Sequence, residues 1–388
     1  MNFKIKDNFL IFSAILIFAS FIHSYFFQLL LLHNFNVFEY LRIIVEFNKN
    51  IQNGSLVPRW APDFGNGYGT PFFIFNQSLG YYITEILYII SYDYFVAIKL
   101  SFFLVTFLSG LFAYLLSKEF SGKFSGLLFS FLYMILPYLS SGLNRSFTFS
   151  GFSALPWIPL VMWSFYKMQN CKKDKIKYLS LSSFSYALLI MSHGNISLIF
   201  LFALLFYIIF MNLYYKKRAN EIIICFISLI IGISLSAFLW LPASCEKKYV
   251  QKHGSVPVWV KKISGKNPEN RFTPLTGKAE LMHEKFYPTE YFLRVKASEG
   301  ASIRINIFYF PGWRAYVWDN NPKNTLKRKE IKIEHSNEYG LMDINIPSGF
   351  PIIDLIFTNT LIRWIADILS YCGVLALYFI YILTRSSK

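Results

Sequence analysis

The stretch ISLIFLFALLFYIIFMNL, residues 196–213, contains no charged side chain. Crossing the hydrocarbon core of a membrane takes about 20 apolar residues in a helix. Further apolar blocks of similar length lie at residues 9–32, 95–116, 124–141, 147–166, 178–192, 221–242 and 361–384. The sequence therefore predicts a polytopic α-helical membrane protein with about eight transmembrane helices.

The composition excludes a water-soluble enzyme. Of the 388 residues, 54% are hydrophobic and 20% aromatic, while only 15% are charged. Soluble domains carry about 25% charged residues. The net charge of +16 would suggest nucleic acid in a soluble protein, but here the basic residues lie between apolar blocks. Such residues orient the chain in a membrane, so we expect no nucleic-acid partner.

The basic clusters predict the orientation of the chain. Cytoplasmic loops of membrane proteins are enriched in Lys and Arg. If eight spans alternate, every cluster falls on one side, so we expect both termini in the cytoplasm and a multi-pass protein of the cell membrane. The clusters are Lys4 and Lys6; Lys118 and Lys123; Lys167, Lys172, Lys173, Lys175 and Lys177; Lys216, Lys217 and Arg218; and Arg385 and Lys388.

This topology predicts four parts of the chain. Residues 1–242 form the transmembrane domain, with a large first outer loop at residues 33–94. Residues 243–290, rich in Lys, Pro and Gly, form an irregular connector. Residues 291–360 form an extracytoplasmic β-domain, and residues 361–388 form the C-terminal transmembrane helix.

The β-domain is expected from alternating apolar residues separated by turn signals. Alternation begins at Ile303, Ile305 and Ile307, and continues in residues 341–346 and 352–357. The turn signals are Pro311-Gly312, Asp319-Asn320-Asn321-Pro322 and Pro347-Ser348-Gly349. A small β-sandwich fits this pattern.

The first outer loop combines an amphipathic stretch at residues 40–51 with a Gly-, Pro- and aromatic-rich run at residues 54–82. Aromatic residues such as Trp60 and Tyr68 either contact a substrate or belong to an ordinary interfacial belt. No cysteine or histidine spacing indicates a metal site, so we expect no cofactor.

Four stretches occur in an order that resembles a known family. They are Asn53-Gly54 with PRWAPD (residues 58–63), GNGYGTPF (residues 65–72) and Tyr81-Tyr82; Ser192-His193; LSAFLWLPASCE (residues 235–246); and FYFPGW (residues 308–313) followed by Asp319, Gly340, residues 347–349 and residues 358–363. This order resembles the bacterial membrane proteins called YfhO-like, or 6-pyruvoyl-tetrahydropterin synthase-related, which are similar to GT-C glycosyltransferases.

The resemblance implies a GT-C-like fold in the bacterial inner membrane. It implies transfer of a sugar from a polyprenyl-phosphate donor to a cell-envelope glycan or lipid on the outer face. The expected partners are therefore membrane lipids, this donor and the envelope acceptor. A divalent metal is compatible with such chemistry, although no spacing of ligands indicates one.

Two acidic residues are candidate catalytic bases for this transfer. In the family an acid of the first outer loop serves as base, and relatives carry an Asp and a His where this chain has Asn34, Asn36 and Glu39. Glu39 takes the role of base, or it is a helix-start acid favoured by the helix dipole. Asp63 binds a sugar hydroxyl or a metal, or it caps its own turn.

Further residues are candidate substrate contacts. Arg59 and Arg145 are expected at the outer face, where a guanidinium either holds a phosphate by two hydrogen bonds or anchors a lipid headgroup. His193 contacts substrate or makes a hydrogen bond at a helix end. Glu246 contributes to the same site, or pairs with Lys247 or Lys248. Trp60 and Tyr68 complete the predicted set.

Two other functions stay open. The chain has only a short connector where relatives carry further spans, which favours a non-catalytic scaffold or accessory subunit whose β-domain binds envelope polymers or a partner enzyme. A transporter or flippase is disfavoured, because Lys99 and His23 are the only obvious ionisable residues well inside predicted spans.

Overall fold

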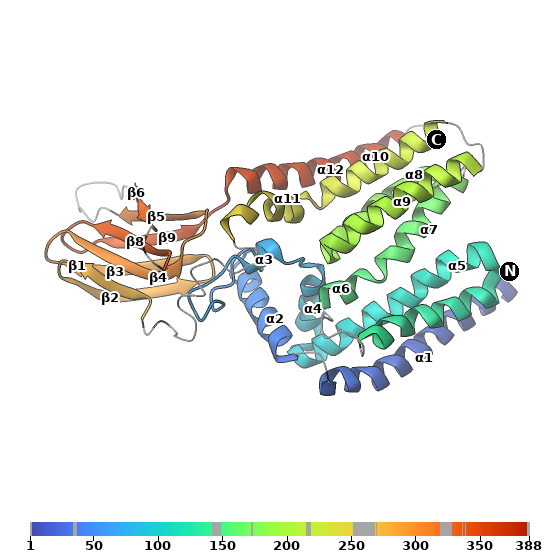
Figure 1. Ribbon diagram of the computed structural model, residues 1–388, viewed down its shortest axis with the longest axis horizontal. Coiled ribbons are helices and arrows are strands. Elements are labelled where there is room, and N and C mark those ends of the chain that lie inside the picture. The colour runs from blue at the N-terminus through green and yellow to red at the C-terminus, as the bar shows by residue number, and fades with distance from the viewer. Residues whose placement is uncertain are drawn as a thin grey trace. The chain divides into compact units, whose positions relative to one another are not determined.

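The computed structural model describes residues 2–33, 37–141, 149–171, 174–214, 219–250, 268, 270–318, 328–335, 337 and 339–385. The chain divides into two compact units (Figure 1). Unit 1 comprises Met1–Ile44, Gln77–Trp240 and Ala366–Lys388, and unit 2 comprises Val45–Asn76 and Leu241–Ile365. The candidate Arg145, the pair Asn34 and Asn36, and the expected turn at residues 319–322 lie outside the described residues.

Most described residues of unit 1 are helical. The helices of the chain are α1 (Asn2–His33), α2 (Val37–Gln52), α3 (Phe72–Phe75), α4 (Leu79–Ser91), α5 (Tyr94–Ser141), α6 (Phe149–Ala154), α7 (Trp157–Asn170), α8 (Lys175–Ser192), α9 (Gly194–Tyr214), α10 (Ala219–Leu235), α11 (Ala237–Cys245), the 3-10 helix η1 (Lys247–Tyr249) and α12 (Leu361–Arg385).

Several helices have the length and hydropathy of membrane spans. Among the described residues, the test is passed by 4 helices, with windows at Asn8–Tyr25, Tyr94–Pro137, Gly194–Tyr214 and Leu361–Ile382. The pair α10 and α11, bent by 70°, makes a fifth if it is counted as one span. The expected block 147–166 is divided between α6 and α7, and the block 178–192 lies within α8. The number of eight spans stays a prediction.

Helix α5 contains both apolar blocks that were expected between residues 95 and 141. Its helical geometry is broken at Gly122, where φ is 81°. The two halves on either side of this break lie side by side. The Ser130 hydroxyl donates to the Gly110 carbonyl at 2.8 Å, and the Ser117 hydroxyl donates to the Gly126 carbonyl at 3.2 Å. The element is therefore a helical hairpin.

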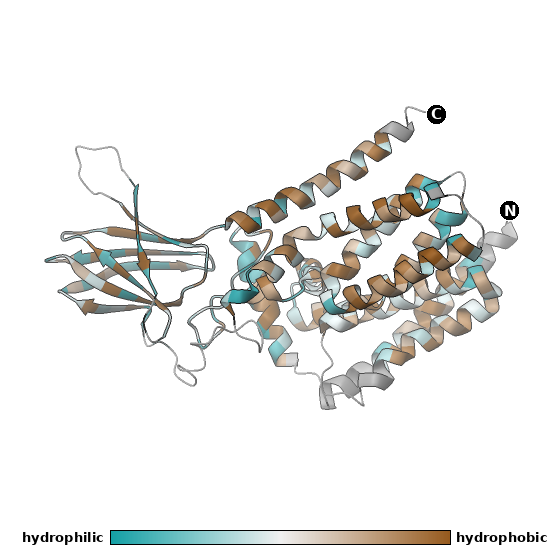
Figure 2. Ribbon diagram, turned by 45° about the horizontal axis from the view of Figure 1, so that its top comes forward, coloured by the Kyte–Doolittle hydropathy of each residue, from teal (hydrophilic) through white to brown (hydrophobic). Residues whose placement is uncertain are grey.

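The helices of unit 1 consist largely of hydrophobic residues, drawn in brown in Figure 2. On α9, Ile199, Phe202 and Phe206 lie on one helix face and are exposed by 73%, 68% and 73%. Exposing so much of these large apolar side chains to water would be energetically unfavourable. A lipid surrounding removes that cost, so the helices support a location in the membrane.

The β-strands all lie in unit 2. They are β1 (Phe272–Thr276), β2 (Ala279–Tyr287), β3 (Glu290–Ala297), β4 (Ala301–Phe308), β5 (Trp313–Trp318), β6 (Arg328–Ile331), β7 (Ile333–Glu334), β8 (Leu341–Ile346) and β9 (Ile352–Phe357). They form a four-stranded sheet in the order β1-β4-β8-β7 and a five-stranded sheet in the order β2-β3-β9-β5-β6. The described strand pairs are antiparallel.

The two sheets share one hydrophobic core. In β4 buried and partly exposed residues alternate, so Ile303 and Ile305 face the core. Leu293 of β3 and Leu355 of β9 contribute to the same cluster from the other sheet. The expected β-domain near the C-terminus is confirmed, and the strands at residues 341–346 and 352–357 occur where the alternation predicted them.

Two expected domain boundaries are wrong. Strands β1 and β2 lie in residues 243–290, which the sequence assigned to an irregular connector. They were missed because most of their side chains are exposed, so no apolar alternation marks them. The transmembrane domain was also expected to run through residues 1–242, but Val45–Asn76 packs with the sandwich in unit 2.

Candidate functional site

The Gly- and Pro-rich run that the sequence assigns to a first outer loop forms a closed turn in unit 2. The Ala61 N–H donates to the Thr70 carbonyl at 2.8 Å, and the Thr70 N–H donates back to Ala61 at 2.9 Å. Gly69, with φ at 76°, closes the turn, and a Cβ added there would lie 2.6 Å from Nε1 of Trp60. Only glycine fits this position, because both the backbone conformation and the space exclude a side chain.

The turn presents Asp63 to two cations. The Asp63 carboxylate pairs with the Lys49 ammonium and lies 3.5 Å from the Arg271 guanidinium. Lys49 also donates to Glu46 at 2.8 Å, and the Asp63 backbone N–H donates to Glu46 at 3.1 Å. We call Glu46, Lys49, Asp63 and Arg271 the charged cluster. Two carboxylates and two cations therefore meet at one place in unit 2.

The members of the charged cluster differ in exposure. The side chains of Asp63 and Lys49 are exposed by 47% and 40%, whereas that of Glu46 is exposed by only 2%. Arg271 lies between these extremes; its guanidinium stacks 3.6 Å from the Phe286 ring centroid and donates to the Gly67 carbonyl at 3.1 Å. A ligand in solution therefore has direct access to Asp63 and Lys49.

The environment separates the acidities of the two carboxyl groups. Burial raises the pKa of Glu46 above its usual value, against the opposing effect of Lys49. Partial burial also acts to raise the pKa of Asp63, but the hydrogen bond and charge of Lys49 outweigh it, and the pKa of Asp63 lies below its usual value. Carboxyl groups with separated pKa values suit different roles in acid–base chemistry.

Trp60 and Tyr68, both predicted to contact substrate, belong to the sandwich core. Trp60 is 0% exposed, and its ring centroid lies 5.4 Å from Trp313 and 5.1 Å from Phe357. Tyr68 packs on Phe308 with ring centroids 5.2 Å apart. The turn that carries Asp63 is thus anchored by aromatic rings, and neither ring offers a stacking face at the surface.

Glu246 forms a buried ion pair. Its Oε2 accepts hydrogen bonds from Nε and Nη2 of Arg363 at 3.1 and 2.9 Å, and its Oε1 accepts from the Thr360 hydroxyl at 2.7 Å. Both charged side chains are exposed by 2% or less. Pairing with Lys247 or Lys248 was therefore the wrong expectation, and Glu246 is committed to holding the start of α12.

Of the remaining candidates, Glu39 and His193 belong to unit 1 and Arg59 to unit 2. Glu39 is exposed in the first turn of α2, within unit 1. Arg59 is 8% exposed in unit 2. His193, between α8 and α9, accepts a hydrogen bond at Nδ1 from the Ile196 N–H at 3.2 Å, which is a helix-end contact.

Sequence reasoning missed three members of the charged cluster. Glu46 and Lys49 are three residues apart in an amphipathic stretch, a spacing that places them side by side on a helix. The sequence alone could therefore have predicted this pair. Arg271 comes from a distant part of the chain, in the segment expected to be irregular, and nothing local connects it with Asp63.

The charged cluster can bind an anion and accept a proton, and nothing in it indicates a metal. Lys49 bridges the two carboxylates, so a cation at that position would repel its ammonium. Within the described ranges, no group of three or more His, Cys, Asp and Glu residues could hold a metal ion.

Comparison with known proteins gives one match. Residues 73–288 match the model of the family described as 6-pyruvoyl-tetrahydropterin synthase related domain, membrane protein. The chain belongs to this family. No curated protein and no solved structure matches the chain. The match of this 6-pyruvoyl-tetrahydropterin synthase-related chain includes Arg271, His193 and Glu246 but begins after Asp63. The family supports a membrane protein; GT-C likeness stays a prediction.

Proposed function

We propose that the chain is a GT-C-like glycosyltransferase that moves a sugar from a polyprenyl-phosphate donor to a cell-envelope glycan or lipid. The observation that supports the proposal is the charged cluster, in which a half-exposed carboxylate on a turn lies between two cations. Such a transfer needs a base for the acceptor hydroxyl and positive charge for the departing phosphate. The charged cluster contains both kinds of group.

In this proposal Asp63 is the base, and Lys49 and Arg271 bind the phosphate. The acceptor oxygen loses its proton to Asp63 as it bonds to the sugar carbon, and the carbon–oxygen bond to the lipid phosphate breaks with its electron pair leaving on the phosphate. The donor phosphate competes with Asp63 for Lys49. Its binding weakens the interaction that keeps the pKa of Asp63 low, so the carboxylate becomes a better base when donor is present.

The test is a transfer assay with full-length protein in lipid nanodiscs and polyprenyl-phosphate-linked hexoses. Asp63→Asn should lower kcat by about 100-fold or more while donor still binds. Lys49→Gln and Arg271→Gln should instead weaken donor binding. Lys296→Gln, which removes an exposed cation from β3, is the matched control. Glu39→Gln tests the second predicted base, since Glu39 is exposed at the start of α2. No consumption of any donor, or full activity of Asp63→Asn, would reject the mechanism.

A non-catalytic accessory subunit of envelope glycan assembly is the second candidate. Two residues from the stretches that resemble the family favour this candidate, because both have structural roles. Trp60 fills the core, and the Glu246 carboxylate is fully hydrogen-bonded by Arg363 and Thr360. These contacts stabilise unit 2 and occupy the groups that a substrate would otherwise use. Co-purification with an intact glycosyltransferase would support this role, and turnover by the isolated chain would reject it.

Both functions require the proposed topology of a bacterial inner-membrane protein that crosses the bilayer about eight times, with cytoplasmic termini. Reporter fusions after residues 60, 320 and 388 test it. The first two should report the outer face and the last the cytoplasm. Opposite faces for residues 60 and 320 would separate the first outer loop from the β-domain and overturn the topology.

A further inference from the structure

Two adjoining hollows open on the sandwich of unit 2, and no residue of the charged cluster lines either of them. They have volumes of about 250 and 440 Å³ and share Tyr309, Trp313, Arg314 and Glu330. We call them together the β-domain groove. The first hollow is completed by Ile331 of β6, Ile333 of β7 and Lys332 between these strands. The second is completed by Pro311, Gly312 and residues 358–360 before α12.

The size and lining of the β-domain groove suit a small polar ligand. Sites for small molecules have volumes of about 300–1,000 Å³. Here the lining is mainly polar, and the hollows are open to solvent. A lipid tail or an apolar peptide would gain little from such walls, whereas a ligand rich in hydroxyl groups finds hydrogen-bond partners along them.

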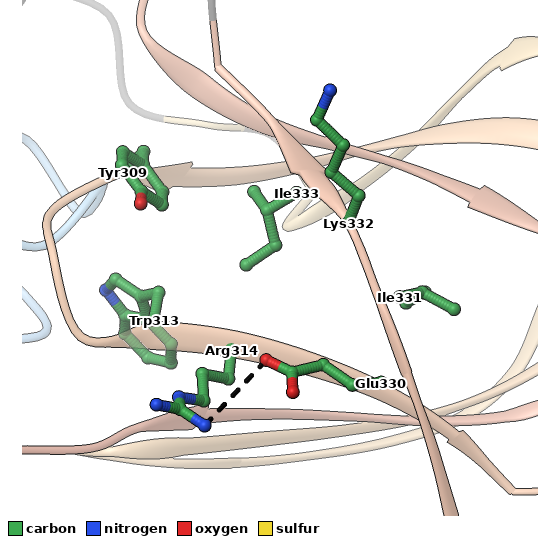
Figure 3. A pocket seen from close by; sticks show the side chains of 7 residues that line it. All are labelled: Tyr309, Trp313, Arg314, Glu330, Ile331, Lys332 and Ile333. Atoms are coloured by element: carbon green, nitrogen blue, oxygen red, sulfur yellow. Dashed lines mark ion pairs between the residues drawn. The ribbon is translucent and has the colours of Figure 1, made fainter.

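The charges of the groove favour an anion. Arg314 and Glu330 face each other in Figure 3 at 3.9 Å, near the limit of an ion pair, and both are more than half exposed. Water screens such a pair, so a ligand carboxylate can replace Glu330 at the guanidinium. Lys332 extends outward at the rim in Figure 3 and adds a second positive charge.

The partly buried Tyr309 favours a sugar ring as the carrier of that anion. Trp313 is only 4% exposed, so its ring belongs to the sandwich core beneath the groove. Tyr309 is partly buried, with its ring centroid 3.9 Å from that of His335, and it is the aromatic side chain of the lining that a ligand can reach. Aromatic rings provide rigid apolar surface for the C–H faces of a sugar, while the Tyr309 hydroxyl offers a polar contact. Arg314 can bind a planar carboxylate through two parallel hydrogen bonds.

We propose that the β-domain groove binds an anionic sugar residue of a glycan chain, with Arg314 holding its charged group. The ligand carboxylate or phosphate takes the place of Glu330 at Arg314, and Tyr309 contacts the sugar ring. This site is separate from the sugar transfer proposed above and does not depend on it, since binding requires neither Asp63 nor a donor lipid.

The test is calorimetric titration of the full chain in nanodiscs of zwitterionic lipid. The probes are a tri-hexuronate, a neutral trihexose, a hexose phosphate and inorganic phosphate. The tri-hexuronate or the hexose phosphate should bind more tightly than the neutral trihexose, and the stronger of the two identifies the source of the charge. Arg314→Gln should weaken this binding by about tenfold or more.

Two variants make the result specific. Glu330→Gln should tighten the binding severalfold, because it removes the carboxylate that competes with the ligand for Arg314. Lys296→Gln, an equal loss of charge elsewhere on the sandwich, should leave it unchanged. The proposal is overturned if no saccharide binds, if neutral and anionic trimers bind equally, if Arg314→Gln binds as the wild type does, or if inorganic phosphate binds as tightly as the sugars.

Discussion

Two of the arrangements of charged residues in unit 2 differ clearly in burial. The Glu246–Arg363 pair is almost completely buried, and Arg363 also donates to the Thr358 and Pro311 carbonyls at 3.1 and 2.8 Å. The charged cluster instead leaves Asp63 and Lys49 nearly half exposed. The carboxylate and the guanidinium of the buried pair are both occupied by hydrogen bonds within the protein. The charged cluster instead has groups that water and ligands can reach.

This difference indicates which arrangement is structural. Breaking a buried ion pair leaves an uncompensated charge in a low-dielectric environment, so it is strongly destabilising. Exposed pairs contribute little, because water solvates either partner when the other leaves. We therefore infer that Glu246 and Arg363 hold the sandwich to the start of α12, while the charged cluster can exchange partners during function.

The largest effect is expected from breaking the buried pair. Glu246→Gln leaves the Arg363 cation buried without a counter-charge, so it should lower the free energy of unfolding of unit 2 by about 3–5 kcal/mol. Hydrogen exchange of the β9 amides in detergent measures this loss. Glu330→Gln is the exposed control, and it should change the same quantity by about 0.5 kcal/mol or less.

A double variant makes this test sharper. Glu246→Leu combined with Arg363→Met replaces both charges by apolar side chains, and it should recover much of the stability that Glu246→Gln loses. Equal exchange rates for Glu246→Gln and Glu330→Gln would contradict the inference that burial separates the two arrangements.

The next effect concerns how the Asp63 turn is held. If aromatic packing rather than charge anchors the turn, Gly69→Ala should destabilise unit 2 by about 2–4 kcal/mol, since a methyl group there overlaps the Trp60 ring. Gly54→Ala is the matched control. Gly54 also has a positive φ, at 83°, but nothing lies within 4 Å of its added Cβ, so only the backbone cost of about 1 kcal/mol applies.

Thermal unfolding of the two variants separates the alternatives. Similar melting temperatures for Gly69→Ala and Gly54→Ala would show that the Trp60 contact does not anchor the turn. The charged cluster would then have a larger structural role than its exposure suggests.

The contrast between buried and exposed side chains also explains which parts of the fold the sequence could predict. Strands β8 and β9 were found because one side of each packs in the core, which produces a period of two. Strand β2, with its exposed side chains, has no such period. The membrane class followed directly from apolar blocks, but short or bent helices such as α8, α10 and α11 leave the number of spans open.

Site residues were harder to predict because their partners are distant in sequence. Glu246 was expected to pair with the adjacent Lys247 or Lys248, yet its partner is 117 positions away. Trp60 was expected at a surface because it lies in a polar, Gly-rich loop, and its burial depends on a sandwich formed by a later part of the chain. Only the pairing of Glu46 with Lys49 is local enough to be visible in the sequence.

The smallest effect is expected from the charged cluster itself, and its pH dependence has a definite sign. Because the pKa of Asp63 is lowered on folding, its ion pairs stabilise unit 2 above the ordinary carboxyl pKa of about 4, and this contribution is lost as the pH falls through the lowered value. Glu46 acts in the opposite direction, since burial raises its pKa and protonation relieves the cost of its buried charge.

Asp63→Asn in a Glu46→Gln background therefore isolates the Asp63 contribution. At pH 7 the added substitution should cost about 1 kcal/mol or less, and the difference should shrink as the pH falls below about 4. Exchange of the Gly67 and Gly69 amides, which donate to the Asp63 and Phe64 carbonyls at 3.2 and 2.9 Å, reports it. A cost as large as that of Glu246→Gln would contradict the comparison, because a cluster so tightly bound to itself has no carboxylate or cation to offer a substrate.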